Sequence, residues 1–217
     1  MQQRPATSRT DWFVFQRWAQ YDGELRVSQL RMIGIAAFYA IHLWAYASGS
    51  GRLPSWGFLQ IADTVDISPR FHLLVTLLAL AWLLVSANTL LLLRNHIFPS
   101  RLPWITSGLD VLFLTSLICV AAGPRSPLVA GYFLLIVLSG LRFSLPLIRF
   151  TTLGCLVGYA VVLGQAKWPA RFGKLPEIVD SIPRYQQLIF ATALVLTGIC
   201  MGQIVRRVEA AFTREVA

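Results

Sequence analysis

Apolar and polar residues occupy separate segments of this chain, instead of alternating within each segment. Six apolar runs carry almost no charge, and nearly every charged residue lies in the joints between the runs. A surface helix of a water-soluble domain would instead carry one polar face along its whole length. The pattern therefore predicts helices whose outer surfaces face lipid, since a helix needs about 20 apolar residues to cross a bilayer.

Each apolar run predicts one transmembrane helix. We expect an all-α membrane protein in which six transmembrane helices form one bundle over residues 31–205. The predicted helices are 31–48, 72–93, 105–122, 128–146, 149–165 and 187–205. The joints after the third and fourth runs are so short that helices three, four and five should be antiparallel neighbours.

The segments on either side of the bundle are more polar. Residues 1–30 combine aromatic residues with arginines, which is typical of a short amphipathic helix lying in the membrane interface. An aromatic belt beside the first span is the alternative. Residues 206–217 continue the last helix, and an apolar stripe there predicts a docking face for a protein partner or for a second copy of the chain. The stripe consists of Val205, Val208 and Phe212.

Composition and charge narrow the class further. Hydrophobic residues make up 56% of the chain and charged residues 13%, against about 25% charged residues in an average soluble domain. The net charge of +9 would suggest nucleic-acid binding in a soluble protein. Here the basic residues lie mainly at helix ends, and 12 of the 19 fall on the side that holds both termini. By the positive-inside rule we expect both termini in the cytoplasm and no nucleic-acid partner.

The sequence carries no recognisable catalytic or metal-binding motif. Its three cysteines lie inside apolar runs without the C-x-x-C spacing of a metal site. His42 lies in the first run, and no second histidine is expected at its depth within the hydrocarbon, so a bis-histidine haem is not predicted. We therefore expect no catalytic residue, no metal and no enzyme activity.

Asp110 is the only acidic residue within a predicted span. A carboxylate in hydrocarbon costs about 2.5–3.5 kcal/mol on insertion scales, so it normally faces a partner or water. Arg142, near the end of the fourth span, lies at a similar depth at a rise of about 1.5 Å per residue. We predict that the two side chains face each other, as an ion pair or through water. A pair that locks two helices, a proton or ligand site, and snorkelling of each side chain to the interface all remain open.

Two pairs of glycines are spaced for close helix packing. Gly154 and Gly158 lie in the fifth predicted span, and Gly198 and Gly202 lie in the sixth. Small residues four positions apart let helix backbones approach each other closely. We expect spans five and six to pack through these glycines, with dimerisation as the competing use.

A tight turn follows the third predicted helix and reads Gly123-Pro124-Arg125-Ser126-Pro127. This chain resembles the sensor half of bacterial redox-responsive histidine kinases. Their pattern is an aspartate in span three, then an outer turn that reads Gly-Gly-x-x-Asn-Pro-Phe, and then a fourth span. Gly123 and Pro127 match that turn. Three neighbouring positions depart from it: Ala122, Ser126 and Leu128.

The resemblance covers spans two to six. It implies an input or anchoring module of the bacterial inner membrane, with a possible quinone site at the Gly123–Pro127 turn. Similar modules precede cyclase and Ser/Thr kinase domains, but this sequence contains no kinase, cyclase or Walker signature. We therefore expect the module to act through a protein partner. The alternatives are an accessory subunit of a larger respiratory-type membrane complex and a small transporter.

Overall fold

The computed structural model describes residues 7–49, 68–121, 123–168 and 182–215, and these residues form only helices and the turns that join them. The six α-helices are α1 (Thr7–Gly49), α2 (Pro69–Arg94), α3 (Leu102–Val120), α4 (Gly131–Gly140), α5 (Leu145–Lys167) and α6 (Arg184–Glu215). Two short 3₁₀ helices, η1 (Gly123–Arg125) and η2 (Pro127–Ala130), precede α4. The all-helical fold is therefore confirmed for the described residues.

Five of the described helices are long and apolar enough to cross a membrane. The fourth apolar segment is not, because its helical part covers only Pro127–Gly140. This is shorter than the predicted 128–146. The segment ends in a turn where Phe143 adopts a positive φ of 47°, and Pro146 then suits the first turn of a new helix because it has no N–H to leave unpaired. Residues 145–146 thus begin α5 instead of ending the fourth helix.

The predicted short helix in the first 30 residues is not a separate element. One continuous helix, α1, runs from Thr7 to Gly49 through this segment and the first predicted span. The face of α1 that carries Glu24, Val27 and Ser28 is buried inside the protein. This part of α1 packs against other helices because its small and charged residues find partners there, as described below.

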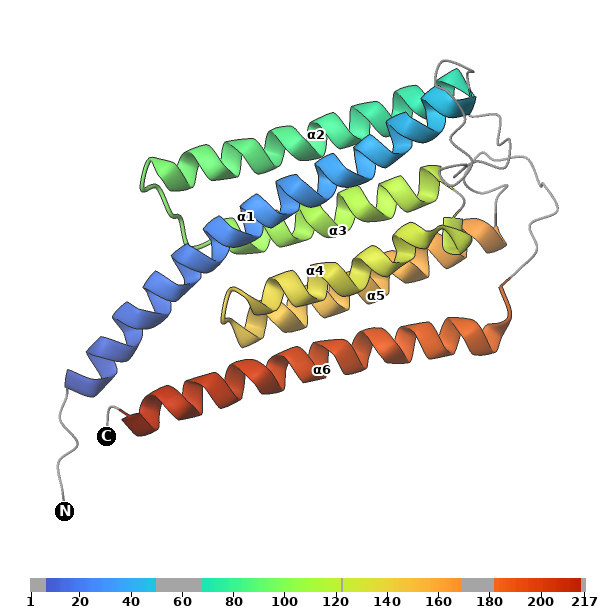
Figure 1. The fold of residues 1–217 in the computed structure, drawn as a ribbon. Coiled ribbons are helices and arrows are strands. Elements are labelled where there is room, and N and C mark those ends of the chain that lie inside the picture. Colours follow the sequence, from blue (N-terminus) through green and yellow to red (C-terminus); the bar gives the residue numbers. More distant parts are fainter. Residues whose placement is uncertain (1–6, 50–67, 122, 169–181, 216–217) are drawn as a thin grey trace.

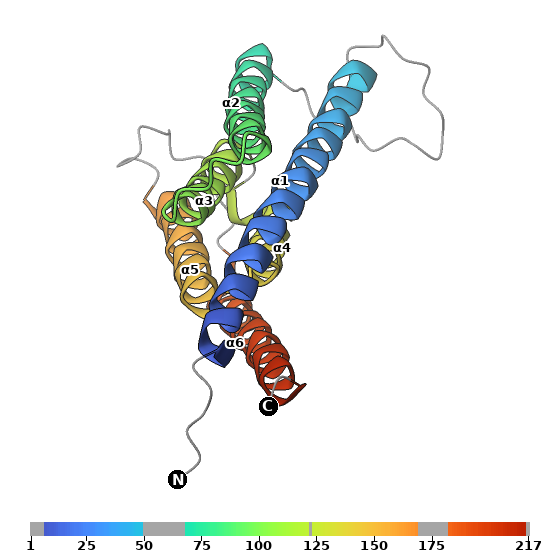
Figure 2. The same ribbon diagram turned by 90° about the vertical axis from the view of Figure 1, so that its left-hand side faces the viewer.

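The helices form one bundle whose middle is made by α3, α4 and α5 (Figures 1 and 2). Helices α1 and α2 pair on one side, and α2 joins the pair to α3. Helix α6 lies on the other side against α4 and α5. The core between α3, α4, α5 and α6 contains Leu114, Ile118, Tyr132, Ile136, Cys155 and Leu194.

The first turns of α1 and the last turns of α6 lie at the same end of the bundle and extend past it (Figure 1). Gly23 packs against the α4–α5 turn at Leu141, and Gly202 lies 3.6 Å from Leu145 at the start of α5, measured from an added Cβ. From these levels to Thr7 and Glu215, each helix extends by roughly 20 Å at a rise of about 1.5 Å per residue.

The two glycine pairs serve different helix contacts. A Cβ on Gly198 would overlap Thr152 of α5, so this glycine allows α6 to approach α5 closely. Gly154 and Gly158 of α5 face α3 instead, where an added Cβ would meet Val111 and Thr115. The glycines of α6 thus lie at the expected interface with α5, while those of α5 lie against a different helix.

We expect Gly198→Ala to lower the free energy of unfolding by about 1–3 kcal/mol, the usual cost of overpacking a tight contact. Thr152 cannot easily turn away, since β-branched side chains are restricted at χ1. Gly202→Ala is the matched control on the same helix, because an added Cβ there would make only an ordinary van der Waals contact with the Leu145 side chain. Thermal unfolding of the detergent-solubilised variants measures both, and equal stability of the two variants would show that α6 does not sit this close to α5.

Candidate functional site

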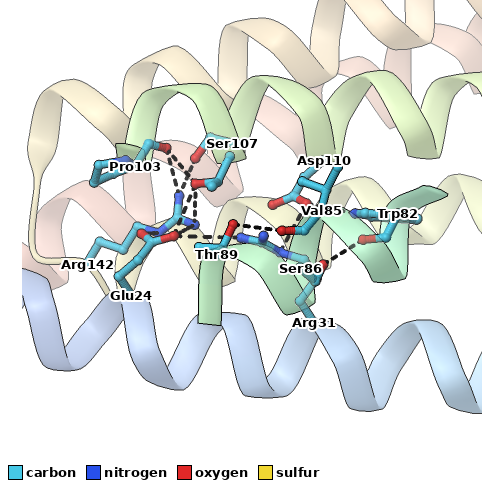
Figure 3. A network of polar contacts seen from close by, with 11 residues as sticks. Glu24, Arg31, Trp82, Val85, Ser86, Thr89, Pro103, Ser107, Asp110 and Arg142 are labelled. Carbon is cyan, nitrogen blue, oxygen red and sulfur yellow. Dashed lines mark hydrogen bonds and ion pairs between the residues drawn. The ribbon is translucent and has the colours of Figure 1, made fainter. Parts of the chain in front are cut away.

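Four charged side chains are buried together where α1 meets α3 and the end of α4 (Figure 3). They are Glu24 and Arg31 from α1, Asp110 from α3 and Arg142 from the α4–α5 turn, and none is more than 5% exposed. Two arginines and two carboxylates give the group no net formal charge. Burying ions is costly, but the cost is offset when each charge has a close partner and further hydrogen bonds.

Glu24 and Arg142 form a two-pronged ion pair. Arg142 Nε lies 2.7 Å from Glu24 Oε2, and Arg142 Nη2 donates to Glu24 Oε1 at 3.0 Å. Such paired contacts match the planar guanidinium to the planar carboxylate and are stronger than single ones. Thr106 of α3 adds a hydrogen bond to the same Glu24 Oε1 at 3.1 Å.

Helix α3 supplies acceptors for the rest of the Arg142 guanidinium. Nη1 donates to the Pro103 carbonyl oxygen at 3.2 Å and to the Ser107 hydroxyl. The Pro103 carbonyl oxygen also accepts from the Thr106 hydroxyl at 3.2 Å, which is possible because a carbonyl oxygen has two lone pairs. Arg142 therefore joins α1, α3 and the α4–α5 turn at a single point.

Asp110 pairs with Arg31 rather than with Arg142. Arg31 Nε lies 3.0 Å from Asp110 Oδ1, and the indole N–H of Trp82 on α2 donates to the same oxygen at 2.8 Å. Arg31 Nη2 lies 3.9 Å from Glu24 Oε1, which connects the two ion pairs. The two pairs thus form one network across α1, α2, α3 and the α4–α5 turn.

The structure places Asp110 and Arg142 beside the same cavity but in different ion pairs. Both side chains line one small cavity of about 10 Å³, together with Ser107, Ser139 and Thr151. A cavity of about 10–15 Å³ with several polar partners is enough for one water molecule. Among the described residues no ion pair joins Asp110 to Arg142, because Asp110 pairs with Arg31 and Arg142 pairs with Glu24, both on α1. A water molecule in the cavity could bridge the two side chains.

Five buried polar atoms of α1 make no hydrogen bond within the described structure: Glu24 Oε2, Ser28 Oγ and the Arg31 atoms Nε, Nη1 and Nη2. Glu24 Oε2 and Arg31 Nε are nevertheless in close ion-pair contact, at 2.7 and 3.0 Å, which leaves Ser28 Oγ and the two terminal nitrogens of Arg31 without a close partner. Ser28 and Arg31 lie three residues apart and so share one helix face. Buried donors without acceptors cost about 1–3 kcal/mol each. The Arg31 side of the network can therefore gain stability from an added acceptor such as water. Each of the three Arg142 nitrogens already has an oxygen within 3.2 Å, Nε through its ion pair and Nη1 and Nη2 through hydrogen bonds.

The polar face of α1 continues beyond the charges. Glu24, Ser28, Arg31, Tyr39, His42 and Tyr46 recur at spacings that keep them on one side of the helix. The Tyr39 hydroxyl lies 3.1 Å from the Thr76 hydroxyl of α2, and His42 Nε2 lies 3.1 Å from His72 Nδ1. Contrary to the sequence interpretation, His42 therefore does have a second histidine at its level. Helix α1 packs on α2 through a polar face, with the buried Ile35 between the two groups.

The predicted quinone-binding turn is compact. Gly123 has φ = +63°, a conformation that glycine adopts without strain. Ser126 is buried and its hydroxyl accepts a hydrogen bond from the Leu128 N–H at 3.3 Å, which caps η2. Pro124 and Arg125 complete η1, and Pro127 begins η2. The structure thus gives these five residues a turn-forming role and does not bring them to the charge network.

Sequence reasoning identified Asp110 and Arg142 but missed Glu24 and Arg31. Glu24 falls in the polar segment of residues 1–30, and Arg31 is the first residue of the first predicted span; charges are common at both places. The signal that could have found them is their spacing, because Glu24, Ser28 and Arg31 fall on the helix face that carries His42 further along.

No protein-family model, no curated protein and no solved structure matches this chain. The functional conclusions therefore depend on the geometry of the network and of the helices that it joins.

Proposed function

We propose that this protein is a non-catalytic membrane module that acts through a protein partner, with the buried charge network holding α1 in place. The observation that carries the proposal is the position of Glu24. It anchors α1 by two contacts of 2.7 and 3.0 Å to Arg142, at the level where α1 leaves the bundle and begins its extension.

A shift of α1 at this anchor would also move the first turns of α1, which extend past the bundle. The last turns of α6 extend from the same end of the bundle (Figure 1), where Val208 is 41% exposed beside Arg206 and Arg207. Val205 is buried, and the Phe212 side chain lies outside the described residues. A module of this kind needs an element with two arrangements that a stimulus can bias. Helix α1 is the candidate, because α2 is the one helix against which it packs extensively.

The membrane assignment belongs to the same proposal. Five helices have the length and composition to span a bilayer, and the excess of basic residues favours the extended end as the cytoplasmic one in a bacterial inner membrane. A quinone is not included at the network, because a cavity of about 10 Å³ holds a water molecule and no ring.

An accessory subunit of a larger membrane complex is the second candidate. It is favoured by the uncovered faces of the outer helices, since only 11% of the apolar window of α1 and 17% of that of α6 is buried. In that case the partner would cover these faces, and its binding would not depend on the charge network.

We expect Arg31→Lys to change recovery of the partner severalfold, because lysine keeps the charge but loses the forked donors. The measurement is quantitative mass spectrometry of proteins retained by tagged protein from gently solubilised membranes. Arg26→Lys is the control, since Arg26 is exposed and pairs with Asp22 on the surface of the same helix.

The wild type and Arg26→Lys should retain the same partner at a fixed ratio. Recovery of no protein at a fixed ratio would refute the proposal. Equal recovery with Arg31→Lys and Arg26→Lys would refute the role of the network and favour the accessory-subunit alternative.

A further inference from the structure

His42 of α1 and His72 of α2 form a second polar site at the other end of the α1–α2 contact. His42 Nε2 lies 3.1 Å from His72 Nδ1, and the two ring planes are within 19° of parallel, with their centroids 5.3 Å apart. The bond joins the ring edges, because the N–H bonds and lone pairs of imidazole lie in the ring plane. One of these nitrogens must carry a proton and the other a lone pair.

Aromatic groups surround the pair. The Tyr46 ring is parallel to the His72 ring, with centroids 4.0 Å apart and an interplanar angle of 3°. An aromatic face held this close attracts a positively charged ring. The other neighbours that the structure packs around the pair are Tyr39, Phe71 and Thr76. No acidic side chain is among these described neighbours, and the adjacent residue Arg70 is exposed.

We propose that His42 and His72 together form a site for a single additional proton, through which the module responds to pH. The proton adds to the ring nitrogen that is not in the shared bond, either His42 Nδ1 or His72 Nε2. The donor ring then becomes an imidazolium, and the N–H···N bond becomes charge-assisted and stronger. The face of Tyr46 stabilises the same charge.

A second proton cannot bind in this arrangement. It would have to occupy the nitrogen that accepts the shared bond, so two N–H groups would point at each other across 3.1 Å and two positive rings would be in contact. Binding of the second proton therefore requires the ends of α1 and α2 to separate. Two sites coupled this strongly take up protons in two steps that belong to the pair.

The inference rests on the proposed function in one respect: protonation of the histidine pair would be the stimulus to which the module responds. His42 and Glu24 lie on the same face of α1. Separation of α1 from α2 at the histidine end would therefore act on the helix that the charge network anchors.

The test is histidine ¹⁵N NMR of the intact protein in detergent micelles over a pH titration. The chain has three histidines, and the third, His96, is exposed in the α2–α3 turn and serves as an internal control. We expect His42 and His72 to report the same two steps, separated by more than about one pH unit, which is at least about tenfold in proton affinity.

His72→Gln should reduce the His42 titration to a single step, and His96→Gln should leave both steps of the pair unchanged. If His42 and His72 titrate in the wild type as two independent single transitions within about half a pH unit of each other, the sites are uncoupled and the inference is wrong. The titration needs no partner, so its failure is distinguishable from a failed partner recovery.

Discussion

Glu24→Gln is expected to destabilise the folded protein by about 3–5 kcal/mol, the usual cost of removing one member of a buried ion pair. The substitution preserves the size of the side chain but leaves the Arg142 guanidinium, which is 2% exposed, without its carboxylate. Thr106 would also lose its charged acceptor. The measurement is equilibrium unfolding of the solubilised protein with increasing SDS or temperature.

Asp22→Asn provides the matched control for this result. Asp22 lies two residues from Glu24 on α1 and also pairs with an arginine, Arg26, at 2.9 Å. That pair is on the surface, with the two side chains 68% and 36% exposed, so its loss should cost less than about 1 kcal/mol. If the two variants have equal stability, Glu24 is not buried against Arg142, and α1 is not anchored as described.

A double-mutant cycle separates pairing from general disruption. Because Arg142→Gln removes the uncompensated charge, the double variant Glu24→Gln, Arg142→Gln should be more stable than the sum of the single effects predicts. Coupling of directly contacting groups typically amounts to about 0.5–3 kcal/mol. Strictly additive effects would contradict a direct ion pair.

The helical fold could be predicted from sequence because a long apolar segment in lipid must satisfy its own backbone hydrogen bonds, which an α-helix does. The fourth helix shows where that reasoning fails. The predicted span continues through residues 141–146. Hydropathy cannot register that Phe143 takes a left-handed conformation and that Pro146 lies in the first turn of a new helix. Backbone geometry, and not composition, ended the helix after Gly140.

The site could be predicted only in part for a related reason. A charge within an apolar run stands out, so Asp110 was found, and its depth led to Arg142. Glu24 and Arg31 do not stand out, because they lie beside Asp22 and Arg26, which are on the surface. Only the packing of α1 tells the buried charges from the exposed ones, and that packing depends on contacts distant in sequence.

Gly23→Ala should displace α1 from the bundle without altering any charge. An added Cβ would overlap the Leu141 carbonyl oxygen and lie 3.2 Å from Arg142 Cα. These are backbone atoms that cannot rotate away, so α1 must move and the adjacent Glu24–Arg142 pair must lengthen. We expect a loss of stability of about 3 kcal/mol or more, at the upper end of overpacking effects.

Gly34→Ala on the same helix has the opposite expectation. Its Cβ would meet no atom within 4 Å, and alanine favours a helix over glycine by about 1 kcal/mol. The two variants make the same chemical change eleven residues apart, so general effects of alanine on α1 cancel in their comparison. Equal stability would mean that α1 does not touch the α4–α5 turn, whereas a large difference would locate the anchor of α1 at the turn that carries Arg142.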